Sequence, residues 1–306
     1  MKIMVFDVGG TEIKYSVMDE QMHRTDSGAV PTPQDTQAQF LDTVYRLYAP
    51  HKDEVSGIAM ALPGFVDNRT GYVSNGGALL YNTATPVGQL LAEKCSCPVI
   101  LENDGKAAAM AELANGALKD CCNAAVFIIG TGVGGGIIAN GQLVRGVHFT
   151  AGEYSFVNTN AEAWDAPDQN MACQCSTSNL LKWYRARKAL PEDAPLDGRS
   201  FFAAANAGEP EALEVLRRFC HAVAVQIYNL TVLLDVEKVA IGGGISKQPL
   251  LLESLRSAYN GLYASRAGQA YMEGLPRCQI VPCAFSSEAN QVGVAAAYFE
   301  AMQKKR

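Results

Sequence analysis

The sequence predicts an α/β fold with mixed sheets, repeated along the chain as two lobes with a cleft between them. Short apolar strands lead into glycine-rich turns at three places, and the first two turns are followed by a second strand. Predicted helices occur in both halves of the chain, which indicates sheets covered by helices. With 306 residues, 48% of them hydrophobic, the chain can bury a large core, and its length favours two domains over one.

The first half supplies one copy of this plan. Apolar residues at 2–6 predict a buried strand, and the β-prone residues 13–18 predict the strand that returns after the first glycine turn. A turn and a polar connection are expected from there to Pro33. The spacing of apolar residues then predicts helices over 35–48, 87–94 and 106–117, and strands over 55–62 and 98–101.

The second half begins in the same way. Residues 124–129 predict a strand that enters the second glycine turn, and 136–144 predict a hairpin with Asn140-Gly141 at its tip. Helices are expected over 211–234, 250–262 and 288–303, and strands over 238–241 and 279–285. Strand, glycine turn and returning strand therefore occur twice.

Charge and hydropathy exclude several classes of protein. The net charge is −6 and the Lys and Arg residues are scattered, so no basic stripe for nucleic acid is present. No apolar run approaches the roughly 20 residues that span a bilayer. The apolar start at 1–6 runs directly into Asp7, which does not fit a signal peptide. We therefore expect a cytoplasmic protein with neither a nucleic-acid nor a membrane partner.

The nine cysteines indicate reduced thiols. An odd number spread along a large chain argues against a disulfide framework. Three close pairs invite a metal hypothesis, but none has a second Cys or His pair at a standard zinc spacing, and the four histidines are isolated. These pairs are Cys95/Cys97, Cys121/Cys122 and Cys173/Cys175.

The three glycine turns, at 7–11, 130–136 and 242–244, are the strongest functional signal. Glycine removes the Cβ that would keep a backbone away from a phosphate, and consecutive backbone N–H groups in such turns form an anion-binding nest. A single Gly-Gly pair is more often an ordinary tight turn. Three of them, each preceded by a strand, favour nucleotide binding and make ATP the first ligand to test.

Two other nucleotide motifs fit less well. The only Gly-Lys pair, Gly105-Lys106, is followed by Ala107 and lacks the upstream glycine of a P-loop. Residues 130–135 match the G-x-G-x-x-G pattern, and Glu153 follows at about the distance of a ribose-binding acid. A dinucleotide site needs a helix directly after these glycines, whereas this segment predicts a hairpin.

Two aspartates stand at predicted strand ends, and each has a structural and a functional interpretation. Asp104 could cap the alanine-rich helix that follows, or its carboxylate could face a cleft as a general base beside Asn103. Asp7 could form an Asx turn or hold Mg²⁺, directly or through water.

These residues resemble the ROK family of sugar kinases, within the actin-like superfamily of two-lobed ATPases with an RNase H-like fold. The resemblance covers the whole chain. It rests on Asp7-Val8-Gly9-Gly10-Thr11 with Lys14, Leu62-Pro63-Gly64, Glu102-Asn103-Asp104, the 130–136 turn, Ala151-Gly152-Glu153 and Ile241-Gly242-Gly243-Gly244.

The resemblance implies a phosphate-binding role for the first two turns and an adenosine contact for the third. It implies that Asp104 is the catalytic base, that Asn103 and Glu153 bind sugar hydroxyls, and that Gly64 forms part of the wall of the sugar pocket. Asp7 would hold Mg²⁺ through water. The nucleotide-binding residues implied in this way are Asp7, Gly9, Gly10, Thr11, Lys14, Gly130, Thr131, Gly132, Val133, Gly134, Gly242, Gly243 and Gly244.

The chain departs from the family pattern at a metal site. Many members continue the glutamate motif as Ile-Gly-His and carry a C-x-C-G-x-x-G-C-x-E motif after it. Here Phe156 stands at the histidine position, Leu180 at the third cysteine and Lys182 at the glutamate. Cys173 and Cys175 alone cannot form a closed four-coordinate site, so we expect no structural zinc.

The same departures bear on the substrate. In the family, the lost histidine and glutamate lie toward C1 and C2 of the sugar, so their absence opens that end to a second sugar or an aglycone. The 6-hydroxyl end, with Asn103 and Asp104, is retained. Together with residues 75–78 and 151–156, this pattern looks like the zinc-less β-glucoside kinases, which phosphorylate cellobiose and related β-glucosides at a 6-hydroxyl. Glucokinase and N-acetylmannosamine kinase are the alternatives.

The resemblance also implies the domain organisation. A small lobe would comprise 1–117 and 288–306, with the first phosphate hairpin and the sugar site. A large lobe, 118–287, would hold the second hairpin, the adenosine site and the surface of a homodimer. Repressors of the family carry an N-terminal helix-turn-helix domain, whereas here the phosphate hairpin begins at Asp7. The retained Asp104 and glycine turns argue against a non-catalytic sugar sensor.

Overall fold

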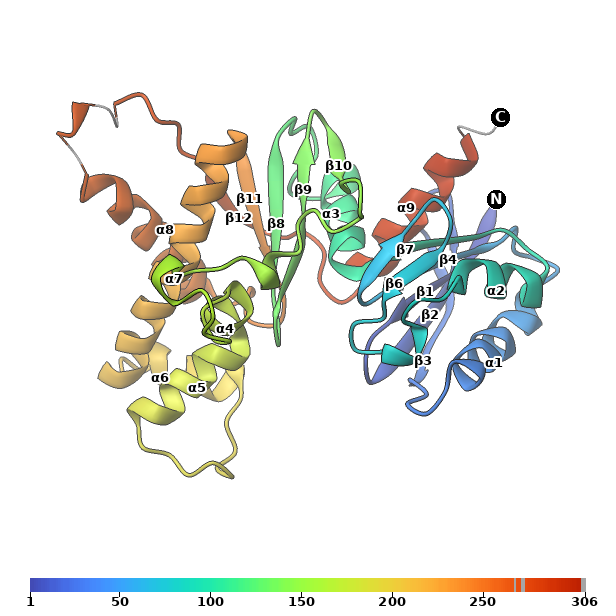
Figure 1. The fold of residues 1–306 in the computed structure, drawn as a ribbon, viewed down its shortest axis with the longest axis horizontal. Helices are drawn as coiled ribbons and strands as arrows, with labels where there is room; N and C mark the ends of the chain where they lie inside the picture. Colours follow the sequence, from blue (N-terminus) through green and yellow to red (C-terminus); the bar gives the residue numbers. More distant parts are fainter. Residues whose placement is uncertain (267, 271–272, 304–306) are drawn as a thin grey trace. The chain divides into compact units, whose positions relative to one another are not determined.

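The computed structural model describes residues 1–266, 268–270 and 273–303 and divides the chain into two compact units (Figure 1). Unit 1 comprises Met1–Asn115, Arg145–Ala151 and the C-terminal segment from Ser287. Unit 2 comprises Gly116–Val144 and Gly152–Ser286. The predicted boundaries placed the Arg145–Ala151 segment in the large lobe, whereas its contacts lie in unit 1. Residues 304–306, assigned above to the small lobe, lie outside the described residues.

The two units contain five-stranded sheets of the same topology. In each, three consecutive strands pair antiparallel and two later strands extend the sheet in parallel, which confirms the predicted mixed sheets and duplicated plan. The first sheet has the order β3(Arg24–Pro31), β2(Glu12–Asp19), β1(Lys2–Val8), β4(Ile58–Leu62), β7(Val99–Asn103). The second has the order β10(Gln142–Val144), β9(Val133–Ala139), β8(Ala124–Ile129), β11(Lys238–Gly242), β12(Gln279–Pro282).

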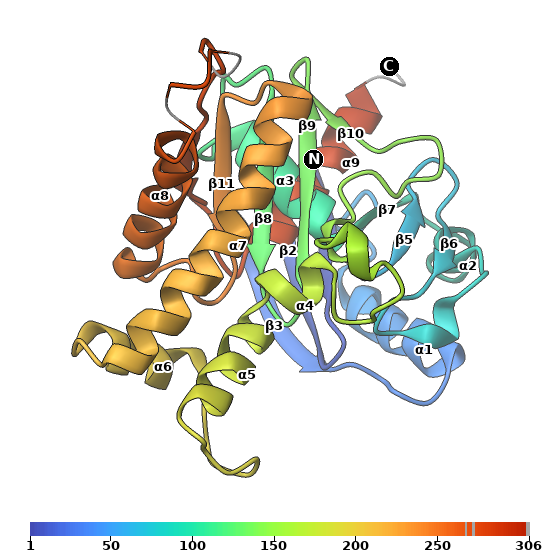
Figure 2. The same ribbon diagram turned by 60° about the vertical axis from the view of Figure 1, so that its left-hand side comes forward.

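Helices pack on these sheets within each unit (Figure 2). Unit 1 has α1(Gln37–Tyr48), α2(Val87–Cys95), α3(Asp104–Asn115) and α9(Ala289–Gln303), with a small hairpin of β5(Phe65–Asp67) and β6(Tyr72–Asn75). Unit 2 has α4(Met171–Cys175), α5(Thr177–Arg187), α6(Gly198–Asn206), α7(Pro210–Leu234) and α8(Pro249–Ala264). Short 3₁₀ turns are η1(Ala49–His51), η2(Leu80–Asn82), η3(Tyr154–Phe156) and η4(Ala161–Ala163). Among the described helices, none combines the length and apolar character needed to cross a bilayer.

Several boundaries differ from the predicted ones. The polar connection before Pro33 contains β3, an edge strand whose side chains are mostly exposed, so it lacks the apolar alternation that marks a half-buried strand. Strand β1 continues to Val8, so Asp7 lies inside the strand. Helix α3 begins at Asp104 rather than at Lys106. The β5–β6 hairpin and helices α4 to α6 were not predicted.

The side chains of β1 alternate between two faces of the first sheet, and this decides where Asp7 points. Met4 and Phe6 join an apolar core with Phe40 and Val44 of α1. Because successive side chains of a strand point to opposite faces, Asp7 lies on the other face. Helix α9 packs against β1, β4 and β7.

Unit 2 has its own core, in which Phe127 of β8 and Ile241 of β11 pack with Phe219 and Ile227 of α7. Helix α7 packs along α8 and also contacts α4, α5 and α6.

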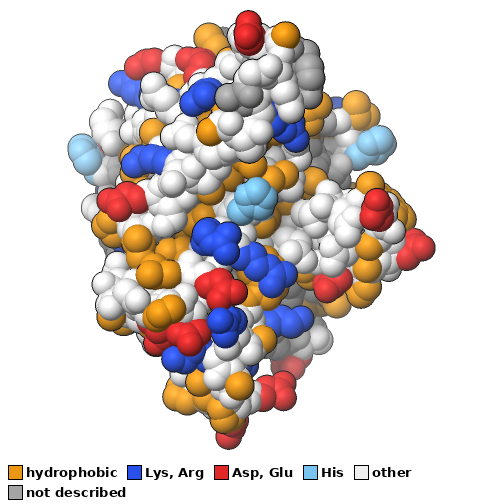
Figure 3. All heavy atoms as spheres, turned by 90° about the vertical axis from the view of Figure 1, so that its left-hand side faces the viewer, with side chains coloured by type: hydrophobic (Ala, Val, Ile, Leu, Met, Phe, Trp, Pro, Cys, Tyr) orange, Lys and Arg blue, Asp and Glu red, His pale blue; other side chains and the backbone are white. Residues whose placement is uncertain are grey.

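On the face that Figure 3 shows, Lys and Arg side chains gather near a His side chain. All nine cysteines are free, as predicted for reduced thiols.

Candidate active site

Three predicted site segments lie at one edge of the first sheet. Strands β1, β4 and β7 are parallel, and their register pairs Asp7 with Ala61 and Leu62 with Asn103. The first glycine turn, Gly64 and Asp104 follow these carboxyl ends directly. In open α/β sheets, ligands bind outside the carboxyl ends of the parallel strands.

Asn103, not Asp104, caps the following helix. The Asn103 Oδ1 atom accepts the N–H of Lys106 at 3.0 Å, which is the geometry of an N-cap residue. Asp104 is the first helical residue, and its Oδ1 accepts the Gly105 N–H at 2.7 Å and an Asn103 Nδ2 hydrogen at 3.1 Å. The capping interpretation of Asp104 is therefore wrong, and Asn103 orients the Asp104 carboxylate.

Gly64 lies where no other residue fits. Its φ is +94°, and a Cβ there would lie 2.0 Å from the carbonyl oxygen of Asn75. The Gly64 carbonyl accepts the second Nδ2 hydrogen of Asn103 at 2.9 Å. The predicted pocket-wall residue thus belongs to the hydrogen-bond network that holds Asp104.

A buried ion pair between Glu102 and Arg145 lies at the end of β7, and the sequence did not predict it. Glu102 is fully buried, and Arg145 reaches its Oε2 atom with both Nε and Nη2 at 2.8 Å. The other carboxylate oxygen accepts the Asn103 N–H at 3.1 Å. Burial raises the pKa of Glu102 while Arg145 acts in the opposite direction. Arg145 therefore compensates a buried charge directly beside the predicted catalytic residue.

Asp7 is a buried carboxylate that could face a cation. It is 9% exposed, and burial raises its pKa above the ordinary value. Asn290 at the start of α9 donates to Asp7 Oδ1 at 2.9 Å, a partner that sequence reasoning missed. Lys14, its register neighbour on β2, lowers the Asp7 pKa. A carboxylate oxygen is a ligand that Mg²⁺ prefers, so the residue type fits the predicted role.

Each glycine turn leaves backbone donors available. Two consecutive N–H groups per turn have no acceptor among the residues that the structure describes, and consecutive N–H groups of this kind attract anions. They belong to Gly10 and Thr11, to Thr131 and Gly132, and to Gly243 and Gly244.

In each of the same turns, at least one carbonyl oxygen already accepts a hydrogen bond from another part of the protein. As a result, the turns present more N–H than C=O groups to a ligand, which suits phosphate. The hydrogen bonds run from Thr32 Oγ1 to the Gly9 oxygen at 2.7 Å, from Thr177 N to the Gly130 oxygen at 2.9 Å, and from Ser246 Oγ to the Gly243 oxygen at 2.9 Å.

The second and third turns meet within unit 2. Strands β8 and β11 pair in parallel up to Ile128 and Gly242, and a Cβ on Gly243 would lie 2.1 Å from the Ile129 oxygen. Strand β9 follows the second turn, with Val133 paired to Ile129, which confirms the predicted hairpin and the exclusion of a dinucleotide site. At the hairpin tip Asn140 and Gly141 both have positive φ, as an Asn-Gly turn requires.

Glu153 is half-buried at the start of η3, beside the second turn. The adjacent Ser155 hydroxyl donates to the Val133 oxygen at 2.9 Å and lies 3.1 Å from the Val133 nitrogen. Gly132 approaches the same hydroxyl, since its Cβ would lie 3.1 Å from it. The predicted sugar ligand and the second glycine turn are therefore neighbours in unit 2.

The segment that contains Cys173 and Cys175 is held by hydrogen bonds. Asn170 caps α4 by accepting the Cys173 N–H at 3.0 Å, and its Nδ2 donates to the Pro167 oxygen at 2.9 Å. Burial raises the pKa of Cys175 to about 12, so its thiol stays protonated at neutral pH. Phe156 is 71% exposed.

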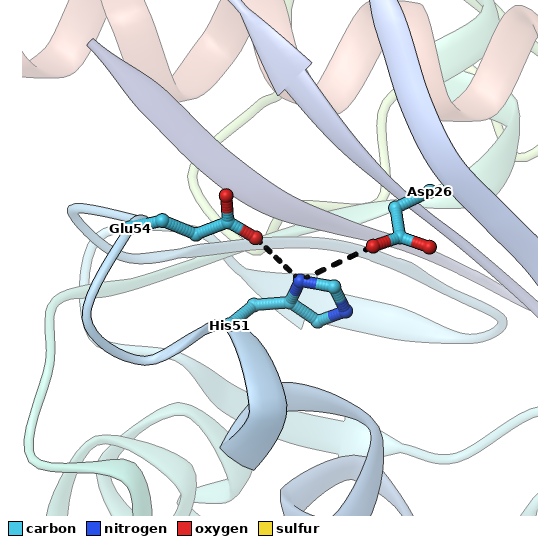
Figure 4. A group of neighbouring side chains, drawn as sticks. All are labelled: Asp26, His51 and Glu54. Carbon is cyan, nitrogen blue, oxygen red and sulfur yellow. Dashed lines mark hydrogen bonds and ion pairs between the residues drawn. The ribbon is translucent and has the colours of Figure 1, made fainter.

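A group of potential metal ligands lies elsewhere in unit 1, and ion pairs account for it (Figure 4). His51 Nδ1 lies 2.6 Å from Glu54 Oε1 and 3.7 Å from Asp26 Oδ2. The hydrogen bond from His51 lowers the Glu54 pKa, and Lys2 Nζ lies 3.9 Å from the other Glu54 oxygen. The group ties β3 to the turn after α1, and we assign no metal to it.

Comparison with known proteins identifies the family. A family model described as ROK family matches residues 3–303. A β-glucoside kinase from Listeria innocua is 30% identical over 258 residues, or 84% of this chain and 87% of that protein. An N-acetyl-D-glucosamine kinase from Vibrio atlanticus is 30% identical over 277 residues, or 82% and 86%.

Solved structures share the fold. A ROK family protein from Streptococcus pneumoniae in complex with sucrose has a TM-score of 0.87 and 28% identity, covering 99% of this chain and 100% of that one. The predicted actin-like α/β fold is confirmed. The chain therefore belongs to the ROK family.

Proposed function

We propose that this protein is an ATP-dependent sugar kinase that transfers the γ-phosphate to a 6-hydroxyl of a β-glucoside such as cellobiose. The observation that carries this proposal is the arrangement at the carboxyl edge of the first sheet. There Asn103 and the Gly105 N–H fix the Asp104 carboxylate, and the donor-rich turn at Gly10 lies at the same sheet edge. Phosphoryl transfer to a hydroxyl requires both a general base and a phosphate cradle.

Asp104 acts as the general base in this proposal. Its carboxylate accepts the proton of the attacking sugar hydroxyl, while Asn103 and the helix start keep it oriented. Glu153 is the further residue proposed to bind sugar hydroxyls. The free N–H groups of the three turns hold the nucleotide, and Gly244 leaves room for close approach because a Cβ there would meet no atom within 4 Å.

Asp7 is the residue proposed to hold Mg²⁺ through water. When bound with the nucleotide, the ion neutralises charge that develops on the phosphates. Asn290 fixes the carboxylate by its bond to Oδ1. We further propose that no structural zinc is needed, because hydrogen bonds of Asn170 support the loop that carries Cys173 and Cys175.

Substrate choice is proposed from two independent features. Relatives named β-glucoside kinase match 84% of the chain at 30% identity. Phe156, which is exposed, and Lys182 stand where the resemblance places a histidine and a glutamate toward C1 and C2 of the sugar, so that end is open to an aglycone. A relative named glucokinase and another named N-acetyl-D-glucosamine kinase keep monosaccharides as the second candidate substrates.

Steady-state kinetics with ATP and Mg²⁺ test the substrate. We expect kcat/KM for cellobiose and gentiobiose to exceed that for glucose, N-acetylglucosamine and N-acetylmannosamine by at least about tenfold. A difference of this size between substrates is expected when the pocket contacts one of them with an additional group. A preference for a free monosaccharide would overturn the β-glucoside assignment while leaving the kinase assignment intact.

A pair of neighbouring glycines tests the nucleotide site. Gly243→Ala forces a strained φ of +96° and a backbone clash, so we expect a loss of about 2 kcal/mol in the free energy of unfolding. Gly244→Ala meets no clash, so stability should stay within about 0.5 kcal/mol of wild type. The KM for ATP should nevertheless rise, because the added methyl enters the proposed adenosine contact. A wild-type KM in a stable Gly244→Ala protein would contradict this contact.

A further inference from the structure

A groove of about 410 Å³ lies between α5 and α7 of unit 2. Its volume is in the range of small-molecule sites. None of its residues belongs to the proposed active site. The lining residues are Trp183, Ala186 and Arg187 of α5 and Glu214, Val215, Arg217, Arg218 and His221 of α7.

The groove carries excess positive charge in an acidic protein. Three arginines line it against one glutamate, whereas the whole chain has a net charge of −6. Glu214 Oε2 lies 2.8 Å from Arg187 Nε, so this carboxylate is engaged by one arginine. Within the part of the chain that the structure describes, Arg217, Arg218 and His221 form no ion pair. Two guanidinium groups are therefore available to an anion.

Packing orients one of these groups. The Arg218 guanidinium stacks over the half-buried Trp183 ring, with its carbon 3.8 Å from the ring centroid. Such cation–π stacking restricts the side chain and reduces the entropy lost on binding. The Arg187–Glu214 pair links α5 to α7 across the same groove. The cation–π contact and the ion pair therefore hold the walls of the groove in place without a ligand.

We propose that this groove binds a phosphate group, as inorganic phosphate or as a phosphate monoester such as a sugar phosphate. Arginine pairs with phosphate through parallel N–H···O bonds, and a dianion matches the two available guanidinium groups in charge. The His221 ring adds a further donor at the same wall. This site is separate from catalysis and does not depend on the proposed function.

Tryptophan fluorescence tests the proposal directly. The chain has two tryptophans, and Trp164 is 74% exposed, so Trp164→Phe leaves Trp183 as the sole reporter inside the groove. This protein is titrated with sodium phosphate and with glucose 6-phosphate at constant ionic strength, with sodium chloride and glucose as controls. We expect a saturable change in emission with both phosphate compounds and none with the controls. Tighter binding of one compound identifies the source of the phosphate.

Two further variants in the same background decide the location. Arg217→Gln should weaken the apparent affinity at least about tenfold, as expected when a charged hydrogen-bond donor is lost. The matched control Arg199→Gln, at an exposed position on α6, should leave it unchanged. Equal affinity in Arg217→Gln, or no saturable change at all, would overturn the proposal. Kinase activity should be unaltered in both variants, so failure of the groove and failure of the kinase assignment are separate results.

Discussion

Replacement of Asp104 by asparagine is expected to lower kcat by about 10²- to 10⁴-fold while leaving sugar affinity nearly unchanged. An amide cannot accept the hydroxyl proton, which is the step assigned to this residue. Its carbonyl oxygen can still accept the Gly105 N–H and the Asn103 Nδ2 hydrogen that now hold Asp104 Oδ1, so the helix start should survive. ADP release measures kcat, and calorimetry measures sugar binding.

The exposed Asp120 offers a matched control for this substitution. Its φ of +70° is tolerated by asparagine as well as by aspartate, so Asp120→Asn should keep wild-type kcat and stability. If the Asp104 variant turned over at the wild-type rate, another group would have to act as the base. If the Asp104→Asn protein failed to bind sugar, the main role of Asp104 would be to bind the sugar and not to act as the base.

Removal of Arg145 is expected to destabilise unit 1 by about 3 kcal/mol, because it leaves the fully buried Glu102 carboxylate without its charged partner. The Arg145 side chain is itself 27% exposed, so this figure sits at the lower end of the range for buried pairs. The thermal unfolding midpoint of Arg145→Ala measures the loss. Because Glu102 accepts the Asn103 N–H, kcat should also fall.

The pH dependence of this loss follows from the direction of the Glu102 pKa. A carboxyl whose folded-state pKa is raised binds more protons in the native state, so stability falls as pH rises from the ordinary value toward the raised one. Without Arg145 the pKa rises further. The deficit of Arg145→Ala should therefore be largest at neutral pH and shrink as pH approaches the ordinary glutamate value of about 4.3.

A double variant serves as the control for the ion pair. Glu102→Gln combined with Arg145→Ala removes the buried charge together with its partner, so it should recover much of the lost stability at neutral pH. A deficit of the same size at every pH, or no recovery in the double variant, would indicate that Arg145 stabilises the unit by packing alone.

The parts of the site that depend on local sequence could be predicted. Glycine turns at strand ends and the Asn140-Gly141 tip have strong local signatures, because few residues other than glycine or asparagine adopt positive φ. The order of helices and strands follows from apolar periodicity, and the predicted strand after the second turn is confirmed as β9. These features were enough to separate this site from a dinucleotide site.

The partners that complete the site come from distant positions and could not be read from local patterns. Asn290 bonds to Asp7 across 283 residues, and Arg145 reaches Glu102 across 43. Capping was one of two interpretations open for Asp104, because aspartate and asparagine are equally good caps, and only the geometry shows that Asn103 is the cap of α3. Strand β3 was missed because an exposed edge strand needs no apolar alternation.

The identity of the phosphorylated product tests the central claim most directly. After incubation with cellobiose, ATP and Mg²⁺, a ³¹P–¹H correlation spectrum should show one phosphate ester coupled to the C6 protons, with one ADP formed per ester. The Asp104→Asn protein should form neither product at a comparable rate. Formation of ADP without a sugar ester, or an ester at another carbon, would contradict the assignment of Asp104 as the base for transfer to a 6-hydroxyl.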